Sequence, residues 1–489
     1  LGVELPPILA IAIPLPTQEP DRTNIGSLIR DDTEQFTKPE HSNKWAGNSI
    51  TFSVVTESTA ATYPLNEKLT AVVAPNENFK VAMRSMFKNM FEPVISMSFV
   101  EVAETDEEQG SIRILLGEIA NYAAAFSSFP ENKPSAGDVR LSSTVELKEG
   151  VPSASDAYTK VGTYEYKTVF HEVGHALGLN HPGNYNAGEA VNPNAKGPFV
   201  PIWVDNVMNT VMSYNLNWDD SNVTTLMPYD IRALQYMYGK NTSFNSTDTT
   251  YTLNFNTATL NEASNADMNS LNLNLAGKRT IWDAGGKDTL NARGLPTDNY
   301  YFDLNPGGLH TAQSARNTST YEGQDGQTYP IDHCGIRLAF DMQIENLLGT
   351  DGNDEVLGNT SDNLVDGGKG NDLLVGGQGN DTLLGGAGND TLSGDFGQDV
   401  LTGGTGADIF KLRSIASTTE LTQADVITDF EVTTDSISLS TGVTQVVEDT
   451  TLNGVTGSLI RNASDHSILG FVNNVFSSQL ATRFVISSL

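Results

Sequence analysis

Seven consecutive nine-residue repeats fill residues 349–411 without a gap, and they constrain the fold more than any other feature of the sequence. The repeats read GTDGNDEVL, GNTSDNLVD, GGKGNDLLV, GGQGNDTLL, GGAGNDTLS, GDFGQDVLT and GGTGADIFK. Glycine dominates positions 1, 2 and 4, Asp or Asn occupies position 6, and a large apolar residue occupies position 8. A flexible glycine-rich linker would not keep that apolar position in phase, so we expect stacked short strands.

A six-residue turn and a three-residue strand in each repeat would build a parallel β-roll, with apolar side chains inside and oxygen-rich loops at both edges. Ligation by carbonyl and carboxylate oxygens alone suits Ca²⁺. Two repeats make one turn of the roll, so each ion should lie between one repeat and the next but one. The predicted calcium ligands in the repeats are Asp354, Gly367, Gly370, Asp372, Gly376, Gly379, Asp381, Gly385, Gly388, Asp390, Asp399 and Asp408.

The two edges of the predicted roll differ in their acidic residues. One edge places Asp354, Asp372, Asp390 and Asp408 in series. The other pairs Asp381 with Asp399, but its outer partner is Asn363, which makes four good sites and one doubtful one. Without calcium, carboxylate repulsion and the entropy of ordering glycine should leave 349–411 unfolded. We expect Asp390→Ala to be the most damaging change and Asn363→Ala to have little effect.

Length and charge narrow the classes of protein to consider. The 489 residues allow two to four domains. The formal net charge of −32 repels nucleic-acid phosphate and anionic lipid, so we expect no nucleic-acid partner. The single cysteine, Cys334, excludes an intramolecular disulfide. Residues 1–16 are apolar but short and contain four prolines, so we expect neither a membrane anchor nor a signal peptide there.

The region before the repeats mixes strand and helix patterns. The strand candidates are TFSVV (51–55), SIRILLGE (111–118) and, after the helical periodicity stops, TYTLNFN (250–256). The helix candidates are FKVAMRSMFKNMFEPV (79–94), YEYKTVFHEVGHALGL (164–179) and MPYDIRALQYMYG (227–239). Gly178 should close the second helix, while Pro228 and Gly239 should delimit the third. The patterns predict an α+β domain followed by an all-β region.

Residues 171–181 read HEVGHALGLNH, which predicts a zinc site. His171 and His175 would lie about 40° apart on one helix face, so two imidazoles can meet one ion. Gly178 lets the chain turn and bring His181 round as a third ligand. Such a site keeps a fourth position for water, whose pKa zinc lowers to roughly 7, and Glu172 is placed to take the proton. The pattern therefore predicts hydrolysis at a carbonyl.

The HEVGHALGLNH motif, followed by VMSYN (211–215), resembles the metzincin metalloproteases. The continuation HPGNYN (181–186), the segment MPYDIRALQYMYG and the repeats narrow this resemblance to the serralysins, secreted bacterial endopeptidases. The resemblance implies zinc on the three histidines, Glu172 as general base and Met212 as a hydrophobic floor. It also implies that Tyr214 ligates zinc at rest and then swings away to bind the tetrahedral oxyanion.

The same resemblance extends beyond the zinc motif. TIWDAGGKDT (280–289) looks like the family's linker calcium loop, with Asp283, Gly285 and Asp288 as ligands and Glu345 completing a neighbouring site. NSTDTT (245–250) departs from the family's preceding ligand loop because it lacks the usual Arg and Gly. The C-terminal region, including DVITDF (425–430) and FVISSL (484–489), resembles the uncleaved signal for a type I secretion exporter.

These observations predict three regions: an extended segment 1–30, an α+β metzincin zinc metalloprotease domain 31–245, and an all-β parallel β-roll 246–489 that ends in the secretion region. The expected protein is a monomeric, extracellular bacterial endopeptidase of broad specificity. It would bind one zinc and several calcium ions, take protein and peptide substrates, admit a proteinaceous inhibitor and not insert into membranes. The alternative is a calcium-dependent adhesion or surface-layer protein with a degenerate protease domain, which the intact zinc motif disfavours.

Overall fold

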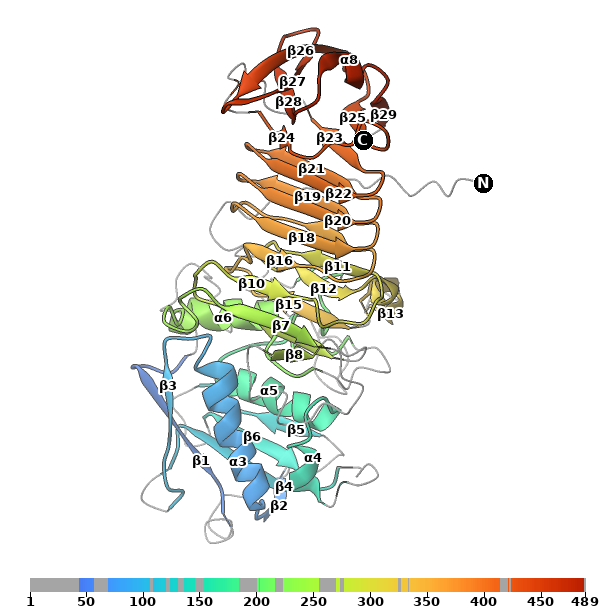
Figure 1. The fold of residues 1–489 in the computed structure, drawn as a ribbon. Coiled ribbons are helices and arrows are strands. Elements are labelled where there is room, and N and C mark those ends of the chain that lie inside the picture. Colours follow the sequence, from blue (N-terminus) through green and yellow to red (C-terminus); the bar gives the residue numbers. More distant parts are fainter. Residues whose placement is uncertain are drawn as a thin grey trace.

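The computed structural model describes most of the chain after residue 43. The described residues are 44–56, 69–105, 109–119, 124–130, 136–145, 151, 153–183, 200–201, 203–215, 223–254, 270–272, 277–323, 327–332, 334–413, 421 and 424–487. They are mostly β-sheet with few helices (Figure 1). The expected segment 1–30 lies outside them. Among the helices in these ranges, none has the length and apolar character needed to cross a membrane.

The N-terminal part is built on one mixed sheet with strand order β3-β1-β4-β6-β5, and β2 pairs with β4. Its elements are β1 (Ser49–Val54), β2 (Leu69–Val73), α3 (Glu77–Met86), η2 (Phe87–Phe91), β3 (Ser98–Glu101), β4 (Ile112–Ile119), β5 (Ala125–Ser127), β6 (Asp138–Ser142), α4 (Ala154–Ala157), α5 (Tyr164–Ala176) and α6 (Pro228–Tyr238). The strand β5 is antiparallel to β6 and ends the sheet. The predicted strands 51–55 and 111–118 are confirmed as parts of β1 and β4.

The helix predicted over 79–94 changes its winding part of the way along. It is an α-helix to Met86 and then a π-helical turn from Phe87 to Phe91. Phe87 and Phe91 are four residues apart, and both rings lie near Phe99 of β3, with centroid distances of 4.6 and 6.0 Å. The wider turn therefore lets both aromatic rings pack against the same edge of the sheet.

The helix α5 contains the first part of the HEVGHALGLNH motif and lies in the core. Its N-cap is Thr163, whose hydroxyl accepts the Tyr166 N–H at 3.1 Å. The side chains from Tyr166 to Ala176 are buried. Gly178 has a φ of 102° and follows the helix end, and the Leu179 N–H then donates to the Gly174 carbonyl at 2.8 Å. The positive φ confirms the predicted turn at Gly178. Glycine suits this position because the left-handed conformation strains any residue that has a Cβ.

Two long sheets make up most of the C-terminal part. Their strand orders are β26-β27-β28-β24-β22-β20-β18-β16-β10-β7-β8 and β29-β25-β23-β21-β19-β17-β11-β12-β15-β9. The elements before the repeats are β7 (Thr250–Asn254), β8 (Ser270–Asn272), β9 (Lys278–Ile281), β10 (Thr289–Asn291), β11 (Tyr300–Asp303), β12 (Leu309–Ala312), η4 (Gln313–Ala315), β13 (Ser319–Glu322), β14 (Thr328–Ile331), β15 (Gly335–Leu338) and β16 (Asn346–Leu348). Those from the repeats onward are β17 (Glu355–Leu357), β18 (Leu364–Lys369), β19 (Leu373–Gln378), β20 (Thr382–Ala387), β21 (Thr391–Phe396), β22 (Val400–Thr405), β23 (Ile409–Leu412), β24 (Val426–Ile427), β25 (Ser436–Ser440), β26 (Gln445–Leu452), β27 (Val455–Asn462), β28 (Ile468–Asn473), α8 (Ser477–Leu480) and β29 (Phe484–Ser487).

The repeats form the parallel β-roll that their period predicts, visible as stacked rungs in Figure 1. Successive repeats alternate between the two sheets, and each residue pairs with the residue two repeats later, as Leu383 does with Leu401. The side chains at position 8 lie fully buried between the sheets: Val356, Val365, Leu374, Leu383, Leu392, Leu401 and Phe410. The phased apolar residue is therefore the core of the roll.

The strands of the roll are longer than predicted. Between β18 and β22, each strand has six residues and covers positions 7 to 9 of one repeat and 1 to 3 of the next. The prediction of a three-residue strand and a six-residue turn is therefore wrong. The ladder continues through the paired glycines because neighbouring rungs approach too closely for a side chain. At Gly377, with a φ of 108°, a Cβ would lie 2.5 Å from the Asn359 carbonyl oxygen.

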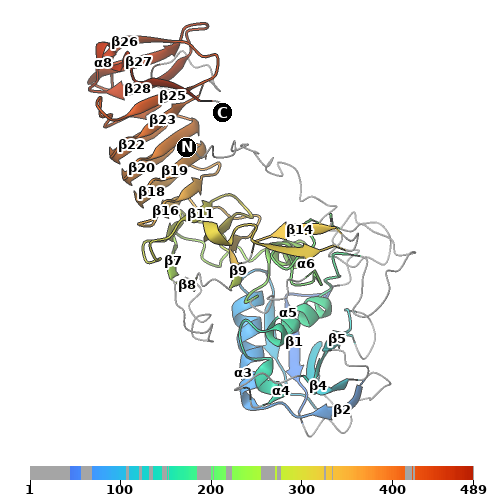
Figure 2. The ribbon, with the colours of Figure 1, turned by 90° about the vertical axis from the view of Figure 1, so that its right-hand side faces the viewer.

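The helix α6 lies between the N-terminal sheet and the base of the roll (Figures 1 and 2). Pro228 begins this helix and Gly239 follows its last residue, as predicted. The Tyr229 ring meets Phe340 edge to face at a centroid distance of 4.7 Å. Nearby, the Thr280 N–H at the start of the roll donates to the Thr225 hydroxyl at 2.8 Å. The segment that precedes α6 is therefore hydrogen-bonded to strand β9.

His310 on β12 is a buried ionisable group without a polar partner. Its side chain is fully buried, and within the described residues neither ring nitrogen has a hydrogen-bond partner. The Phe302 ring lies at a centroid distance of 6.1 Å. Burial lowers the pKa of His310 to about 3, and the positive charge of Arg337 acts in the same direction. The ring is therefore neutral in the folded protein near neutral pH.

His310 should make the folded protein sensitive to acid. Its pKa is lower in the folded than in the unfolded chain, so its contribution is constant above about pH 6.5 and falls as pH drops toward 3. We expect wild type to lose about 2 kcal/mol more than His310→Leu between pH 7.5 and pH 5. Chemical unfolding of both proteins in excess calcium measures this difference. Equal losses in the two proteins would contradict the prediction.

Candidate metal centres

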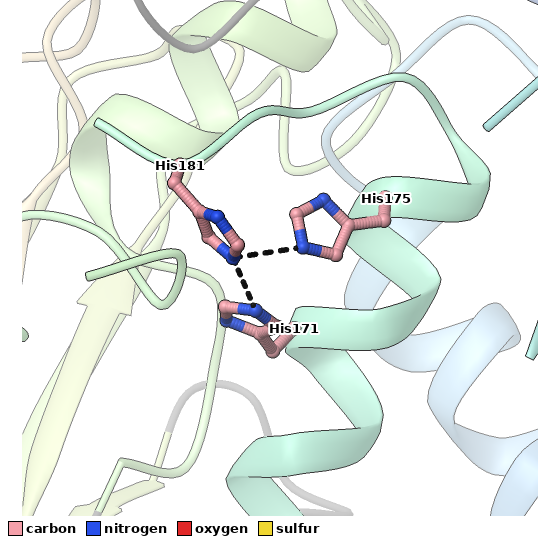
Figure 3. Close-up of side chains that lie close together, drawn as sticks. All are labelled: His171, His175 and His181. Carbon is pink, nitrogen blue, oxygen red and sulfur yellow. Dashed lines mark hydrogen bonds between the residues drawn. The ribbon is translucent and has the colours of Figure 1, made fainter. Parts of the chain in front are cut away.

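The structure brings His171, His175 and His181 together at one point (Figure 3). The Nε2 atom of His181 lies 3.1 Å from the Nε2 atoms of both His171 and His175. Zinc bonded to nitrogen at 2.0–2.1 Å in a tetrahedron would separate its nitrogen ligands by about 3.3 Å. His181 therefore lies at nearly that spacing from both other rings, and the three ligand nitrogens all lie within 4.8 Å of one another.

Backbone contacts fix which ring nitrogen is available. His171 Nδ1 lies 3.0 Å from the Val211 carbonyl oxygen, and His175 Nδ1 lies 2.7 Å from the Leu179 carbonyl oxygen. A carbonyl oxygen only accepts, so each Nδ1 carries the proton and each Nε2 presents a lone pair. Burial, with the neighbouring rings, lowers the pKa of His171 well below its ordinary value. Neutral acceptors this close repel one another, so the donor set fits a cation.

Glu172 lies beside the histidines and makes a different contact. Its side chain is buried, and the Ser127 hydroxyl donates to Oε2 at 2.7 Å. Burial raises the pKa of Glu172 to about 7, and the hydrogen bond from Ser127 opposes that rise. Ser127 lies on β5, so it is an edge-strand residue that contacts the motif helix. No sequence pattern indicates this contact, because 45 residues separate the two side chains.

Met212 packs beneath the motif helix as the resemblance implies. Its side chain is fully buried, and a Cβ added at Gly174 would come within 2.8 Å of Met212 Sδ. A side chain in place of this glycine of the motif would therefore clash with the methionine. Tyr214, two residues on, has 36% of its surface exposed. Its ring centroid lies 4.6 Å from that of His181 and 5.3 Å from that of His171.

Asp230 on α6 holds the segment that contains Met212. Its Oδ2 accepts the Val211 and Met227 N–H groups at 2.8 and 2.9 Å, and its Oδ1 accepts the Thr210 hydroxyl at 2.5 Å. Burial raises the pKa of Asp230 to about 6, against the effect of these donors. The carbonyl of the same Val211 receives His171 Nδ1. Asp230 therefore supports one of the three clustered histidines through a single residue, a role that the sequence analysis missed.

The position-6 aspartates of the roll stack as the repeat predicts. Each backbone N–H donates to Oδ1 of the aspartate 18 residues later at 2.7 to 2.8 Å, as in Asp354 to Asp372, Asp372 to Asp390, Asp390 to Asp408 and Asp381 to Asp399. The second oxygen is different. Within the described residues, Oδ2 of Asp372, Asp381, Asp390, Asp399 and Asp408 is buried without a hydrogen-bond partner. Buried orphan carboxylate oxygens of this kind fit calcium.

Three of the glycines predicted as calcium ligands lie against these oxygens, and three lie against the backbone of the neighbouring rung. A Cβ at Gly367, Gly376 or Gly385 would overlap Oδ2 of the aspartate in the same repeat. Gly370, Gly379 and Gly388 have positive φ values of 111°, 114° and 142°. Burial and the charges of neighbouring aspartates raise the pKa of Asp372 to about 8. A negative charge at this position is therefore unfavourable unless a cation accompanies it.

Asn363 replaces an aspartate with a hydrogen-bonded amide. Its Nδ2 donates to the Glu345 carbonyl at 3.1 Å and to Asn359 Oδ1 at 3.2 Å, while its Oδ1 accepts the Asn359 N–H at 2.9 Å. The side chain is 2% exposed. The sequence analysis gave no role to this amide, whose hydrogen bonds link Asn363 to Asn359 and Glu345, so Asn363→Ala would remove these three hydrogen bonds from the start of the roll.

The predicted linker loop also comes together at the base of the roll. The Asp288 N–H donates to Glu345 Oε2 at 2.7 Å, and Asp283 Oδ1 accepts the Gly285 N–H at 2.8 Å. Burial raises the pKa of Asp288 to about 7, and the nearby charges of Asp283, Glu345 and Asp248 add to this shift. Asp248 belongs to the 245–250 segment, whose sequence departs from the family pattern, yet it lies in the same acidic cluster.

Three further aspartates extend the roll beyond the last repeat, and the sequence analysis did not name them as ligands. The Asp399 N–H donates to Asp425 Oδ1 at 3.1 Å, and the Asp408 N–H donates to Asp435 Oδ1 at 3.0 Å. Asp429 accepts the Gly403 N–H at 2.9 Å. These contacts span 26 or 27 residues instead of 18, so the period that identified the others does not reach them.

Comparisons with known proteins find a repeat family and several related proteases. The model of the RTX calcium-binding nonapeptide repeat matches residues 348–383 and 375–410. Serralysin of Photorhabdus luminescens is 30% identical over 291 residues, covering 58% of this chain and 52% of that protein. Serralysin A of Dickeya chrysanthemi is 33% identical over 200 residues, 39% of this chain and 35% of that protein. This chain is similar to serralysins and carries RTX calcium-binding repeats.

Other relatives extend the comparison. Metalloprotease AprA of Pseudomonas entomophila is 29% identical over 293 residues, covering 56% of this serralysin-like chain and 51% of that protein. The matches thus span about half the length, or less, of each relative. A solution structure of the AlgE6R3 subunit of an Azotobacter vinelandii mannuronan C5-epimerase is 25% identical over 28% of this chain and 80% of that one. Its TM-score of 0.14 is too low to bear on the fold.

Removing the Asp230 carboxylate should weaken zinc binding from a distance. We expect Asp230→Ala to lower zinc affinity by about 10- to 100-fold, because the Val211 peptide that orients His171 loses its support. Competition with a chromophoric zinc chelator measures the affinity. Asp341→Ala is the control, since it removes ion pairs with Lys240 and with Arg232 of the same helix, neither of which is hydrogen-bonded to Val211 within the described residues, and it should leave the affinity unchanged. Unchanged affinity in Asp230→Ala would contradict this role.

Asn363 and Asp390 should affect the roll in different ways. Asn363→Ala should destabilise the calcium-loaded chain by about 1–3 kcal/mol and leave the number of bound calcium ions unchanged, because it removes only hydrogen bonds. Asp390→Ala should lower the number of bound ions, because it removes an orphan oxygen. Native mass spectrometry and chemical unfolding in excess calcium report the two quantities. Loss of calcium from Asn363→Ala would show that the amide site also binds an ion.

Proposed function

We propose that this chain is a secreted zinc-dependent endopeptidase that cleaves extracellular proteins with broad specificity. The observation that carries the proposal is the convergence of the Nε2 atoms of His171, His175 and His181 next to Glu172, which lies on the same helix as His171 and His175. Metalloproteases are among the relatives of this chain, which supports the same chemistry. His171, His175 and His181 would hold the zinc, and Tyr214 is the further candidate ligand.

Zinc in such a site supplies a Lewis acid that polarises the scissile carbonyl and makes water a better nucleophile at neutral pH. Glu172 accepts the proton of the attacking water and delivers it to the leaving amine. Its raised pKa of about 7 suits a group that both takes and returns a proton. Tyr214, exposed beside the histidine rings, donates a hydrogen bond to the oxygen that becomes negative.

The substrate would lie along β5. This strand pairs with β6 on one side and ends the strand order of the sheet within the described residues. Its outer backbone groups therefore suit an extended peptide, which would add to the sheet as a further strand. Recognition through the peptide backbone depends little on side chains, and this favours broad specificity.

The calcium-loaded roll would stabilise the enzyme outside the cell. We propose a zinc metalloprotease domain over 31–245 and a calcium-binding roll over 246–489 that carries the signal for a type I exporter. Millimolar extracellular calcium would fill loops whose carboxylate oxygens lack protein partners within the described residues. A proteinaceous inhibitor of the cleft is a further candidate partner. The chain would act as a monomer without membrane insertion.

Replacement of Glu172 separates the enzyme from the adhesion alternative. Glu172→Ala should lower casein hydrolysis by at least about a hundredfold, because no general base remains, while the zinc content stays the same. Glu165→Ala, on the first turn of the same helix, is the control and should retain activity. Hydrolysis that survives in Glu172→Ala would overturn the mechanism. A zinc-loaded wild type without any hydrolysis would favour a calcium-dependent adhesion or surface-layer protein.

A further inference from the structure

Ser127 connects the candidate general base to the strand that ends the sheet. Its hydroxyl donates to Glu172 Oε2 at 2.7 Å. Within the described residues, no other hydrogen bond to this carboxylate is made, and its side chain is buried. One oxygen of Glu172 is thus held by protein, and the other remains for reaction chemistry. A buried carboxylate with a single donor depends strongly on that donor for its orientation.

The strand β5 presents Ser127 toward the helix because side chains alternate along it. Phe126, the preceding residue, packs on the other side, where the Arg140 guanidinium lies 5.0 Å from its ring centroid. Ser127 pairs with Val139 on β6, so its backbone position is fixed by the sheet. Because the sheet fixes the position of Ser127, the hydrogen bond from its hydroxyl fixes the position of the Glu172 carboxylate relative to β5.

We propose that Ser127 is a positioning residue that orients Glu172 relative to a peptide bound along β5. This inference rests on the proposed endopeptidase function. Ser127 itself need not touch the reacting atoms, since it acts through the carboxylate. A peptide added to the outer edge of β5 would be held by the same strand that holds the base. The attacking water, the scissile carbonyl and the proton acceptor would then share one rigid frame.

The inference predicts a loss in kcat without a loss in binding. Ser127→Ala should lower kcat on a quenched-fluorescence peptide by about 10- to 100-fold, the range expected for a hydrogen bond to a charged group, with KM within about twofold of wild type. Ser127→Thr keeps the hydroxyl and should restore kcat to within about threefold. Ser128→Ala is the matched control, because its hydroxyl contacts Arg140 instead of Glu172. All variants should keep the zinc content of wild type.

A second measurement does not depend on turnover. A peptide hydroxamate binds zinc and also hydrogen-bonds to a neighbouring carboxylate, so calorimetry on the zinc-loaded proteins should show weaker binding to Ser127→Ala by a similar factor. Weaker binding with no hydrolysis by wild type would support positioning and reject the endopeptidase function. Wild-type kcat and hydroxamate affinity in Ser127→Ala would overturn the inference. Equal losses in Ser128→Ala, or no rescue by Ser127→Thr, would also overturn it, because a general disturbance of β5 would then be the cause.

Discussion

Buried acceptor atoms without donors determine how both parts of this molecule hold together. In the roll, the Oδ2 atoms of five aspartates meet no donor within the described residues. At the other centre, two histidines direct their lone pairs at a third across 3.1 Å because their Nδ1 protons are used by backbone carbonyls. Either arrangement is costly in the absence of a cation. At both centres a bound metal ion would therefore turn an unfavourable arrangement of acceptors into a favourable one.

A continuous series of contacts joins the histidine cluster to strand β9 at the base of the roll. The Thr280 N–H, on β9, donates to the Thr225 hydroxyl. Two residues later, Met227 donates its N–H to Asp230, which also binds the Val211 N–H. The Val211 carbonyl then receives His171 Nδ1. Every step is a hydrogen bond or a short covalent stretch, so the base of the roll and the zinc-site histidine belong to one supported frame.

Periodicity explains which parts of the fold and site were predictable. The nine-residue spacing of apolar side chains predicts the roll, and the helical spacing of His171 and His175 predicts from the amino-acid order alone that their rings lie close together. Contacts between residues whose spacing does not repeat along the sequence cannot be predicted in this way. Asp425 and Asp435 continue the acidic ladders, but the intervening segment lengthens the spacing to 26 and 27 residues. Ser127 meets Glu172 only because the sheet and the helix fold against each other.

The substitution at Asn363 shows how the roll begins. A carboxylate offers only acceptors, whereas an amide offers both donors and acceptors. Asn363 therefore satisfies the Glu345 carbonyl and the Asn359 N–H with its own atoms. Its backbone N–H still donates to Asp381 Oδ1, as the aspartates of later rungs do. The repeat that contains Asn363 thus joins the irregular base through hydrogen bonds. Within the described residues of the roll, buried carboxylate oxygens without a partner begin at Asp372, in the next repeat, and there the roll begins to depend on cations.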